Sequence, residues 1–426
     1  MHENNNCLRL IGRGLTMVGF LVSAAACGVI PRGNDAVDQK WYVSHCLPHT
    51  PKLAEGARPA GSEDMTMDAK GVLYISSSDY RLSTNTRARR AGAIYRYDVS
   101  GEGVVAAMKI RSESSRLPAY FEKNFFPHGI SLLETNGRKR LFVINHRLRT
   151  LPRPADPDNL ANRLNISAGE VRQSYVEIFR IEKGPDGEVL VHERTVSDKN
   201  ALALGPAPRG GRGFVLNDLV AVGPQQFLAT NNPRGWRQSV DITIFRNPIG
   251  NIVYFDGEKY SVVKDRIDYG NGINASADNR KIYVATSLDG DLVTYRTNLN
   301  VPGDKQPENI SLEEDGPRMR LGGHLDNIEW VDSTRREMII ASHANLAALG
   351  LQSFDAPVTS PSRIVRFAVG DNGLPVPASA KLIYANNGDQ ISAASVAAYF
   401  KDKTRERLFV GSIFGEQFLT CKLDAH

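Results

Sequence analysis

Oxygen-bearing side chains open a series of similar segments along the chain, and their types indicate a cation site. Calcium takes about 6–8 oxygen ligands from carboxylates, amides, backbone carbonyls and water, whereas zinc prefers sulfur and clustered imidazoles. The opening residues of these segments supply mainly oxygen and no sulfur. They are Glu63, Asp64, His128, Asn217, Asp218, Asn271, Asp326 and Asn327.

Two ligand sets can be separated within this group. One set offers two carboxylates and three neutral oxygens, which a single divalent cation balances: Glu63, Asn217, Asn271, Asp326 and Asn327. Since successive side chains of a strand point to opposite faces, Asp64 and Asp218 should point away from their neighbours and hold a second cation deeper in the molecule. The alternative is that Asx residues only begin strands or cap turns.

The repeated segments predict the elements that must position these residues. Each has a polar start, an alternating apolar strand, a turn and a second β-rich strand, and the starts fall near residues 64, 128, 217, 271, 327 and 395. Four short strands per repeat predict an all-β fold, a six-bladed β-propeller. The two ligand sets would place two calcium ions in its central tunnel. A two-sheet sandwich is the competing fold, but it does not explain six matching segments.

A propeller would gather the six starts at one mouth of the tunnel. The second strand of each segment runs antiparallel to the first, so its polar end returns to the same mouth. We therefore expect a second, wider ring of polar residues there: Ser76, His146, Asn231, Ser287, His343 and Ser412.

The composition indicates an ordinary globular body. The chain has 426 residues, 41% of them hydrophobic, and a net charge of +5 that is spread along its length. So small a charge does not indicate a nucleic-acid partner. No run of about 20 apolar residues follows the N-terminus, so the body is expected to be soluble, and a monomer is the favoured state.

The N-terminus resembles an export signal. Arg9 and Arg13 precede a short apolar stretch from Leu15 to Ala26, and small residues lead into Cys27. Cys27 is expected to be lipidated after cleavage, with residues 1–27 as the signal and 28–45 as a tether on the periplasmic face of the outer membrane. The alternative is an ordinary signal peptide cut nearby, which gives a soluble periplasmic or secreted protein.

The four cysteines fit export. Cys7 lies inside the signal, and lipidation of Cys27 would leave Cys46 and Cys421 at opposite ends of the folded body. Exported proteins form disulfides, so these two are expected to pair and to close a domain spanning residues 46–426. The alternative is two unrelated thiols.

Several motifs resemble the paraoxonase/arylesterase family. They are Gly61-Ser62-Glu63-Asp64, Pro127-His128-Gly129-Ile130-Ser131, Val143-Ile144-Asn145-His146, Leu216-Asn217-Asp218-Leu219, Gly270-Asn271-Gly272-Ile273-Asn274, Leu325-Asp326-Asn327-Ile328 and Gly411-Ser412-Ile413-Phe414. The resemblance implies a six-bladed propeller with two calcium ions and a disulfide between the chain ends. It also implies hydrolysis of lactones, aryl esters and, in some members, organophosphates.

Site residues follow from the resemblance position by position. It implies a catalytic calcium at Glu63, Asn217, Asn271, Asp326 and Asn327, and a structural calcium at Asp64, Asp218 and the backbone carbonyl of Ile130. His128 and His146 match the family's histidine dyad. The substrate pocket is expected to include Tyr80, Asn231 and His343.

The expected chemistry is attack of an activated water on a metal-polarised carbonyl, with His128 as the general base and His146 orienting it. Glu63 or Asp326 could instead activate the water. Residues 147–174, an arginine-containing insertion directly after His146, are expected to act as a lid that contacts a polar or acidic substituent. The rival functions are a gluconolactonase-like or strictosidine-synthase-like propeller enzyme and a non-catalytic, calcium-stabilised binding propeller.

Overall fold

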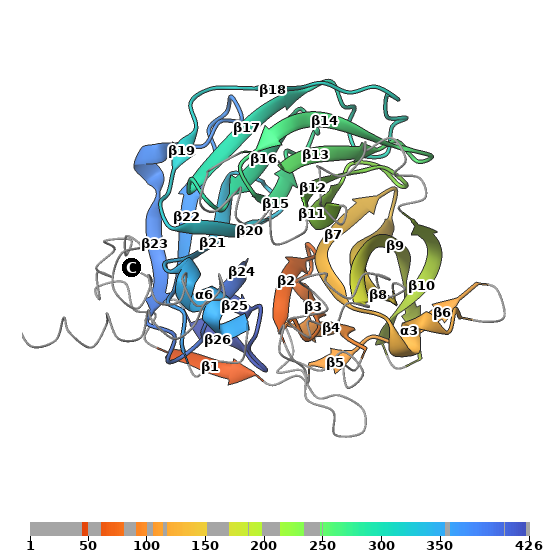
Figure 1. The fold of residues 1–426 in the computed structure, drawn as a ribbon, viewed down its shortest axis with the longest axis horizontal. Helices are drawn as coiled ribbons and strands as arrows, with labels where there is room; N and C mark the ends of the chain where they lie inside the picture. The colour runs from red at the N-terminus through yellow and green to blue at the C-terminus, as the bar shows by residue number, and fades with distance from the viewer. Residues whose placement is uncertain are drawn as a thin grey trace, which may run out of the picture.

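The computed structural model describes residues 45–49, 61–80, 91–99, 105–113, 117–150, 170–185, 187–197, 214–233, 248, 250–353, 358–403 and 405–422. Within these residues the strands form six sheets around a central axis, which confirms the predicted six-bladed β-propeller (Figure 1). In each blade, the strand that opens a repeated segment lies innermost.

The first blade runs outward from the axis as β2 (Ser62–Met67), β3 (Val72–Ser77), β4 (Ala93–Asp98) and β5 (Ala106–Ala107). The second contains β7 (Pro127–Thr135), β8 (Arg138–Thr150), β9 (Glu170–Gly184) and β10 (Gly187–Val196), and β6 (Ile110–Ser112) lies parallel to β10. The third contains β11 (Phe214–Ala221), β12 (Phe227–Pro233), β13 (Gly250–Phe255) and β14 (Tyr260–Ile267).

The fourth blade contains β15 (Gly270–Ala275), β16 (Lys281–Thr286), β17 (Asp291–Thr297), β18 (Leu312–Glu314) and β19 (Met319–Arg320). The fifth contains β20 (His324–Trp330), β21 (Glu337–His343), β22 (Ser362–Ala368) and β23 (Lys381–Asn386). The sixth contains β24 (Ala394–Lys401), β25 (Glu406–Ser412), β26 (Phe418–Lys422) and β1 (His45–His49). The described helices are short: α3 (Tyr120–Lys123), α6 (Leu346–Ser353) and the 3-10 turn η5 (Pro377–Ser379).

The ring is closed by strands from both ends of the folded body. β1 pairs antiparallel with β26, and Cys46 lies directly opposite Cys421 in that register. The two cysteines form a disulfide across 375 residues of sequence, which confirms the predicted pairing. Because the bridge joins the first and last described strands, it holds the sixth blade together covalently as well as by hydrogen bonds.

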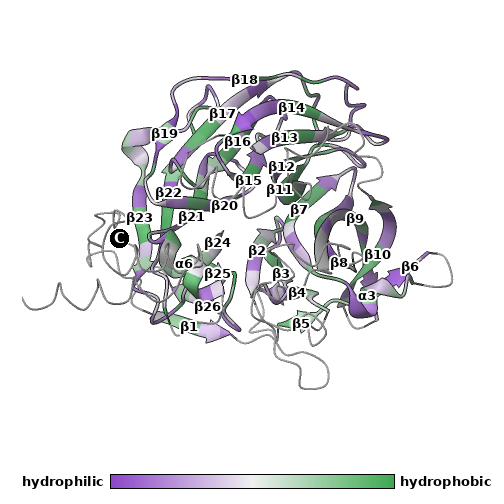
Figure 2. Cartoon of the chain, in the orientation of Figure 1, coloured by the Kyte–Doolittle hydropathy of each residue, from purple (hydrophilic) through white to green (hydrophobic). Residues whose placement is uncertain are grey.

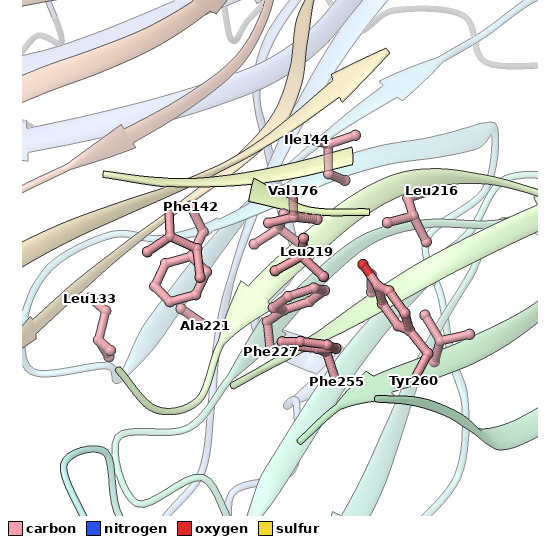
Figure 3. Packing of buried hydrophobic residues seen from close by; sticks show 14 residues of the cluster. Leu133, Phe142, Ile144, Val176, Leu216, Leu219, Ala221, Phe227, Phe255 and Tyr260 are labelled. Carbon is pink, nitrogen blue, oxygen red and sulfur yellow. The ribbon is translucent and has the colours of Figure 1, made fainter. Parts of the chain in front are cut away.

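Apolar side chains fill the spaces between neighbouring blades. Figure 3 shows this packing between the second and third blades, where the ring of Phe142 on β8 meets that of Phe227 on β12 edge-on with centroids 6.2 Å apart, and Phe227 in turn stacks on Phe255 of its own blade. The middle of β16 and β17 is apolar, whereas the outer strand β18 is largely hydrophilic (Figure 2). The buried blade interiors therefore form a rigid frame around the tunnel.

A β-bulge interrupts the innermost strand of every blade at the level of the predicted ligands. Pairing with the second strand shifts register between Ser62 and Asp64, Pro127 and Ile130, Leu216 and Leu219, Gly270 and Ile273, Leu325 and Ile328, and Ala394 and Val396. Bulges bend a strand and re-aim its side chains. Strict alternation was therefore the wrong basis for directing Asp64 and Asp218 away from their neighbours, because both residues lie at a break in the pleat.

Two glycines let the bulges of adjacent blades approach one another. A Cβ on Gly129 would lie 2.7 Å from the Asp218 Cα atom, and one on Gly272 would lie 2.6 Å from the Asp326 carbonyl oxygen. Neither position has room for a side chain. The close approach brings polar groups of different blades into one ring.

Candidate metal centre and active site at the tunnel mouth

The bulge residues of neighbouring blades are hydrogen-bonded to one another around Glu63. The Asn327 side-chain amide donates to Glu63 Oε1 and to the Glu63 carbonyl oxygen, each at 3.1 Å. The Ser395 hydroxyl donates to the same carbonyl at 2.7 Å, and the second carboxylate oxygen, Oε2, lies 3.2 Å from His128 Nδ1. Glu63 is 2% exposed, so these contacts fix a carboxylate inside the tunnel.

Three buried amide oxygens in this ring have no hydrogen-bond donor among the described residues. They are the Oδ1 atoms of Asn217, Asn271 and Asn327. A buried acceptor left without a partner costs about 1–3 kcal/mol, so each of these oxygens is expected to contact a water molecule or an ion. Carbonyl and carboxylate oxygens are the ligands that calcium prefers.

The predicted outer ligand set therefore fits a hard cation. No cluster of three or more His, Cys, Asp or Glu suited to a metal occurs in the described parts of the chain. That result is compatible with the predicted set, since only two of its five members, Glu63 and Asp326, are carboxylates. The roles of all five residues as ligands remain predictions.

Burial and mutual repulsion disfavour the ionised form of the tunnel carboxylates. The pKa of Glu63 is raised well above its ordinary value by burial, and then by the neighbouring Asp64 and Asp326. Burial likewise raises the pKa of Asp218 well above normal and that of Asp64 to about 7. A bound cation would reverse these shifts because it stabilises the charged carboxylates.

The predicted inner ligands link adjacent blades through backbone amides. The two Asp64 oxygens accept the amides of Met65 at 2.9 Å and Ile130 at 2.7 Å. In the same way, Asp218 accepts the amides of Leu219 at 2.7 Å and Ile273 at 2.8 Å. An ionised carboxylate has about four acceptor positions, so both groups can still ligate a hard cation. The structure does not test whether the Ile130 carbonyl is a further ligand, so that role remains a prediction.

Two histidines of the second blade lie side by side at this mouth. The ring centroids of His128 and His146 are 4.7 Å apart, and the ring of Tyr80 packs against His128 with centroids 4.9 Å apart. His146 Nδ1 lies 3.2 Å from the hydroxyl of Ser174, which accepts the backbone amide of Leu216 at 3.0 Å. Ser174 was not predicted as a site residue, although it lies opposite His146 in the β8–β9 ladder.

A second histidine–carboxylate pair lies on the fifth blade. His343 Nε2 is 2.7 Å from Asp326 Oδ2, and both residues are buried. Asn231, also expected in the pocket, donates to Asn251 Oδ1 at 2.8 Å, and its own Oδ1 has no donor among the described residues. The wider polar ring thus contacts the inner ring at several points. Besides His343, the Ser287 hydroxyl accepts from the Asn271 side-chain amide at 3.2 Å, and the Ser76 hydroxyl accepts the Asp64 backbone amide at 3.1 Å.

An apolar patch adjoins the histidines. Tyr80, Ala393 and Phe414 are buried together, and Leu349 of α6 packs against them. The Tyr80 hydroxyl donates to the carbonyl of Pro127, so the tyrosine presents its ring rather than its hydroxyl to neighbouring groups. This cluster places the predicted pocket residue Tyr80 among Ala393, Phe414 and Leu349, which were not predicted as site residues.

The expected lid role fails for Arg147. Its guanidinium is paired with the buried carboxylate of Glu177 and lies 3.3 Å from the ring centroid of Tyr120 and 4.0 Å from that of Tyr175. The predicted insertion begins as a continuation of the β8–β9 ladder up to Thr150 and Glu170. Arg147 is therefore an internal clamp of the second blade, and residues 151–169 lie outside the described residues.

The export and lipidation predictions for residues 1–27 and the tether at 28–45 fall almost wholly outside the described residues, which begin at His45. Among the described helices, none combines the length and apolar character needed to cross a membrane.

The fold and the site together define a propeller with an oxygen-lined centre flanked by histidines. The sequence profile of the family described as Arylesterase matches residues 155–423, and the chain belongs to this family. It is 27% identical over 384 residues to human serum paraoxonase/arylesterase 2, covering 88% of this chain and 89% of that protein.

Two further relatives match nearly the whole chain. Rat serum paraoxonase/arylesterase 2 is 27% identical over 423 residues, and human serum paraoxonase/lactonase 3 is 24% identical over 424 residues. Each alignment covers 98% of this chain and 98% of the relative. Membership of the family supports a hydrolase of esters or lactones that acts on small molecules.

Proposed function

We propose that the chain is a calcium-dependent hydrolase of lactones and aryl esters, with two calcium ions per chain and its active centre at the tunnel mouth. The main support is that the buried amide oxygens of Asn217, Asn271 and Asn327 have no hydrogen-bond donor among the described residues, while the Asn327 amide also donates to Glu63. They would hold one ion together with Glu63 and Asp326. Calcium bound there supplies a Lewis acid for the carbonyl oxygen of the substrate.

His128 is the general base of this proposal. Its Nδ1 faces the Glu63 carboxylate, which favours a proton on Nδ1 and leaves Nε2 as the basic nitrogen. Nε2 takes a proton from water as the water oxygen attacks the carbonyl carbon, and Glu63 stabilises the imidazolium that forms. The proton then passes to the departing oxygen. A lactone yields a hydroxy acid, and an aryl ester yields a carboxylic acid and a phenol.

The neighbours of His128 orient it and shape the site. The rings of His146 and Tyr80 both pack against it, and Ser174 contacts His146 Nδ1. The apolar patch of Tyr80, Phe414 and Leu349 suits the hydrocarbon part of a substrate. His343 is the second candidate for the base, because its 2.7 Å contact with Asp326 also fixes a tautomer.

A panel of lactones, aryl esters and phosphotriesters, assayed before and after calcium removal, tests the proposed activity. We expect lactones and aryl esters to be hydrolysed, lactones in preference to phosphotriesters. Dialysis against a chelator should abolish the activity, and added calcium should restore it. A folded, calcium-loaded protein that hydrolyses none of them would favour a binding propeller. Activity that survives removal of all but one ion, or of all metal, would favour a gluconolactonase-like or strictosidine-synthase-like enzyme.

We further propose that the mature chain is a lipoprotein on the periplasmic face of the outer membrane, attached through Cys27. The basic and apolar pattern before Cys27 supports this proposal. Cys27→Ser should leave the precursor unprocessed or release the chain into the soluble fraction. Fractionation and mass spectrometry of the N-terminus measure both outcomes, and a wild-type chain without lipid that is fully soluble after export would contradict the proposal.

A further inference from the structure

Glu177 lies inside the second blade, and the hydrolytic mechanism does not use it. Its side chain is buried on β9, which pairs with β8 on one side and with β10 on the other. The carboxylate contacts both of these neighbouring strands. Oε1 accepts the side-chain amide of Asn145 at 2.9 Å and pairs with Arg147, both on β8, whereas Oε2 accepts the Thr195 hydroxyl of β10 at 2.7 Å.

Further donors surround the outer side of this carboxylate. His192 Nε2 lies 3.2 Å from Oε2, and the Tyr120 hydroxyl, from α3 beside the outer strands of this blade, donates to the same oxygen at 3.3 Å (Figure 1). Burial opposes ionisation of Glu177, but the hydrogen bond from His192 and the charge of Arg147 outweigh it and lower the pKa below its ordinary value. An ionised carboxylate only accepts hydrogen bonds, so it fixes which atom of a neighbouring amide faces it. His192 lies on the Oε2 side, so its loss would leave the Oε1 contacts in place.

Asn145 links this carboxylate to the strand that carries the proposed base. Because Glu177 accepts Nδ2, the Oδ1 atom of Asn145 points the other way, and it accepts the backbone amide of Phe126 at 2.9 Å. The Phe126 carbonyl in turn accepts the backbone amide of His146 at 3.0 Å. Asn145 lies opposite Pro127, where the β7–β8 ladder begins to shift register. Proline has no N–H to give to that ladder, so the Asn145 side chain supplies a bond between the strands beside it.

The segment that leads into His128 is thus held by side chains from two blades. The Pro127 carbonyl accepts the hydroxyls of Ser78, at 3.1 Å, and of Tyr80, both from the segment that follows β3. Asn145 makes the corresponding side-chain contact from the second blade. Loss of the Asn145 contact would free one side of this segment, and His128 would shift with it.

We propose that Glu177 and Asn145 are positioning residues that hold His128 in the orientation required for proton transfer. This role rests on the proposed function, in which His128 is the base, and neither residue contacts substrate or a proposed calcium ligand. A misplacement of about 1 Å caused by a remote change can lower a rate by roughly 10²-fold. We therefore expect Asn145→Ala to lower kcat by roughly 10–10²-fold and to leave KM and calcium content near their wild-type values.

Steady-state kinetics of the full, folded, calcium-loaded chain with a lactone and an aryl ester tests this role. Asn145→Ala, Glu177→Gln and the double variant form a double-mutant cycle. Glu177→Gln removes the charge that orients the Asn145 amide but keeps an oxygen that can accept from it, so it should lower kcat less than Asn145→Ala. The double variant should be no slower than Asn145→Ala, because both changes break the same chain of contacts.

The matched control is Asn386→Ala on β23, the outermost strand of the fifth blade. Asn386 is also buried, donates to the Tyr384 hydroxyl and accepts the backbone amide of Gly388. Its loss should lower the melting temperature and leave kcat per folded chain unchanged. The same result for Asn145→Ala would show a structural role alone and would overturn the proposal.

Other outcomes separate this role from the proposed function. If Asn145→Ala does not fold, Asn145→Ser, which keeps a small polar group but cannot span both bonds, should show the loss of kcat instead. Fully additive losses in the cycle would overturn the action of Glu177 through Asn145. A loss that falls on KM alone would overturn the positioning role, whereas a wild-type chain that hydrolyses neither substrate would overturn the proposed function itself.

Discussion

His128→Gln should lower the turnover of lactones by roughly 10²–10⁴-fold, because glutamine keeps a polar group at the position but cannot accept a proton from water. The expected loss falls on kcat more than on KM, since the apolar patch and the proposed calcium ligands remain. In the wild-type enzyme kcat/KM should also rise with pH as the base loses its proton. In the variant this rise with pH should be absent. Steady-state kinetics over a range of pH measures both effects.

The matched control is a buried histidine elsewhere in the same blade. His192 Nε2 lies 3.2 Å from Glu177 and is remote from the innermost strands, so His192→Gln should affect stability and leave kcat near the wild-type value. His343→Gln separates the two candidate bases. If His128→Gln retains nearly full turnover and His343→Gln does not, the base is the histidine paired with Asp326. If both retain it, Glu63 or Asp326 remains as the group that activates water.

The propeller fold, and the polar residues at the start of its innermost strands, were predictable because both depend on a pattern that repeats along the chain. Six segments with the same polar start and apolar alternation define six inner strands, and the starts fall at the bulges that the structure places in each blade. The pairing of Cys46 with Cys421 was predictable because export and the lipidation reading left only two cysteines. These inferences required no knowledge of side-chain packing.

The direction of individual side chains was not predictable from the sequence. A bulge breaks the two-residue period, so alternation gave the wrong basis for placing Asp64 and Asp218. Ser174 contacts His146 across a hairpin of 28 residues whose register local sequence does not fix. Arg147 was expected in a lid because it begins the insertion directly after His146, but its guanidinium pairs with the buried carboxylate of Glu177.

The metal-free protein should lose stability as the pH rises from about 4 to 7. Burial raises the pKa of Asp64 from 3.8 to about 7 and raises those of Glu63 and Asp218 as well. A carboxyl whose pKa is higher in the folded state binds more protons there, so its stabilising contribution is present below its unfolded pKa and disappears as the pH passes the folded value. For Asp64 alone the loss is on the order of 4 kcal/mol.

Calcium should reverse the sign of this dependence. The bound ion favours the ionised carboxylates, so their folded pKa values fall below the unfolded ones and stability is lost as the pH falls instead. Urea unfolding between pH 3 and 8 should therefore give an unfolding free energy that falls with rising pH for metal-stripped protein, whereas that of calcium-saturated protein should rise up to about pH 5 and then stay level. Asp64→Asn removes one titrating group and should flatten the metal-free slope, although its amide cannot accept both backbone hydrogen bonds. A metal-free slope that is flat or rising would mean that the tunnel carboxylates are already ionised and stabilised by the protein alone, and the ion would not be needed to balance them.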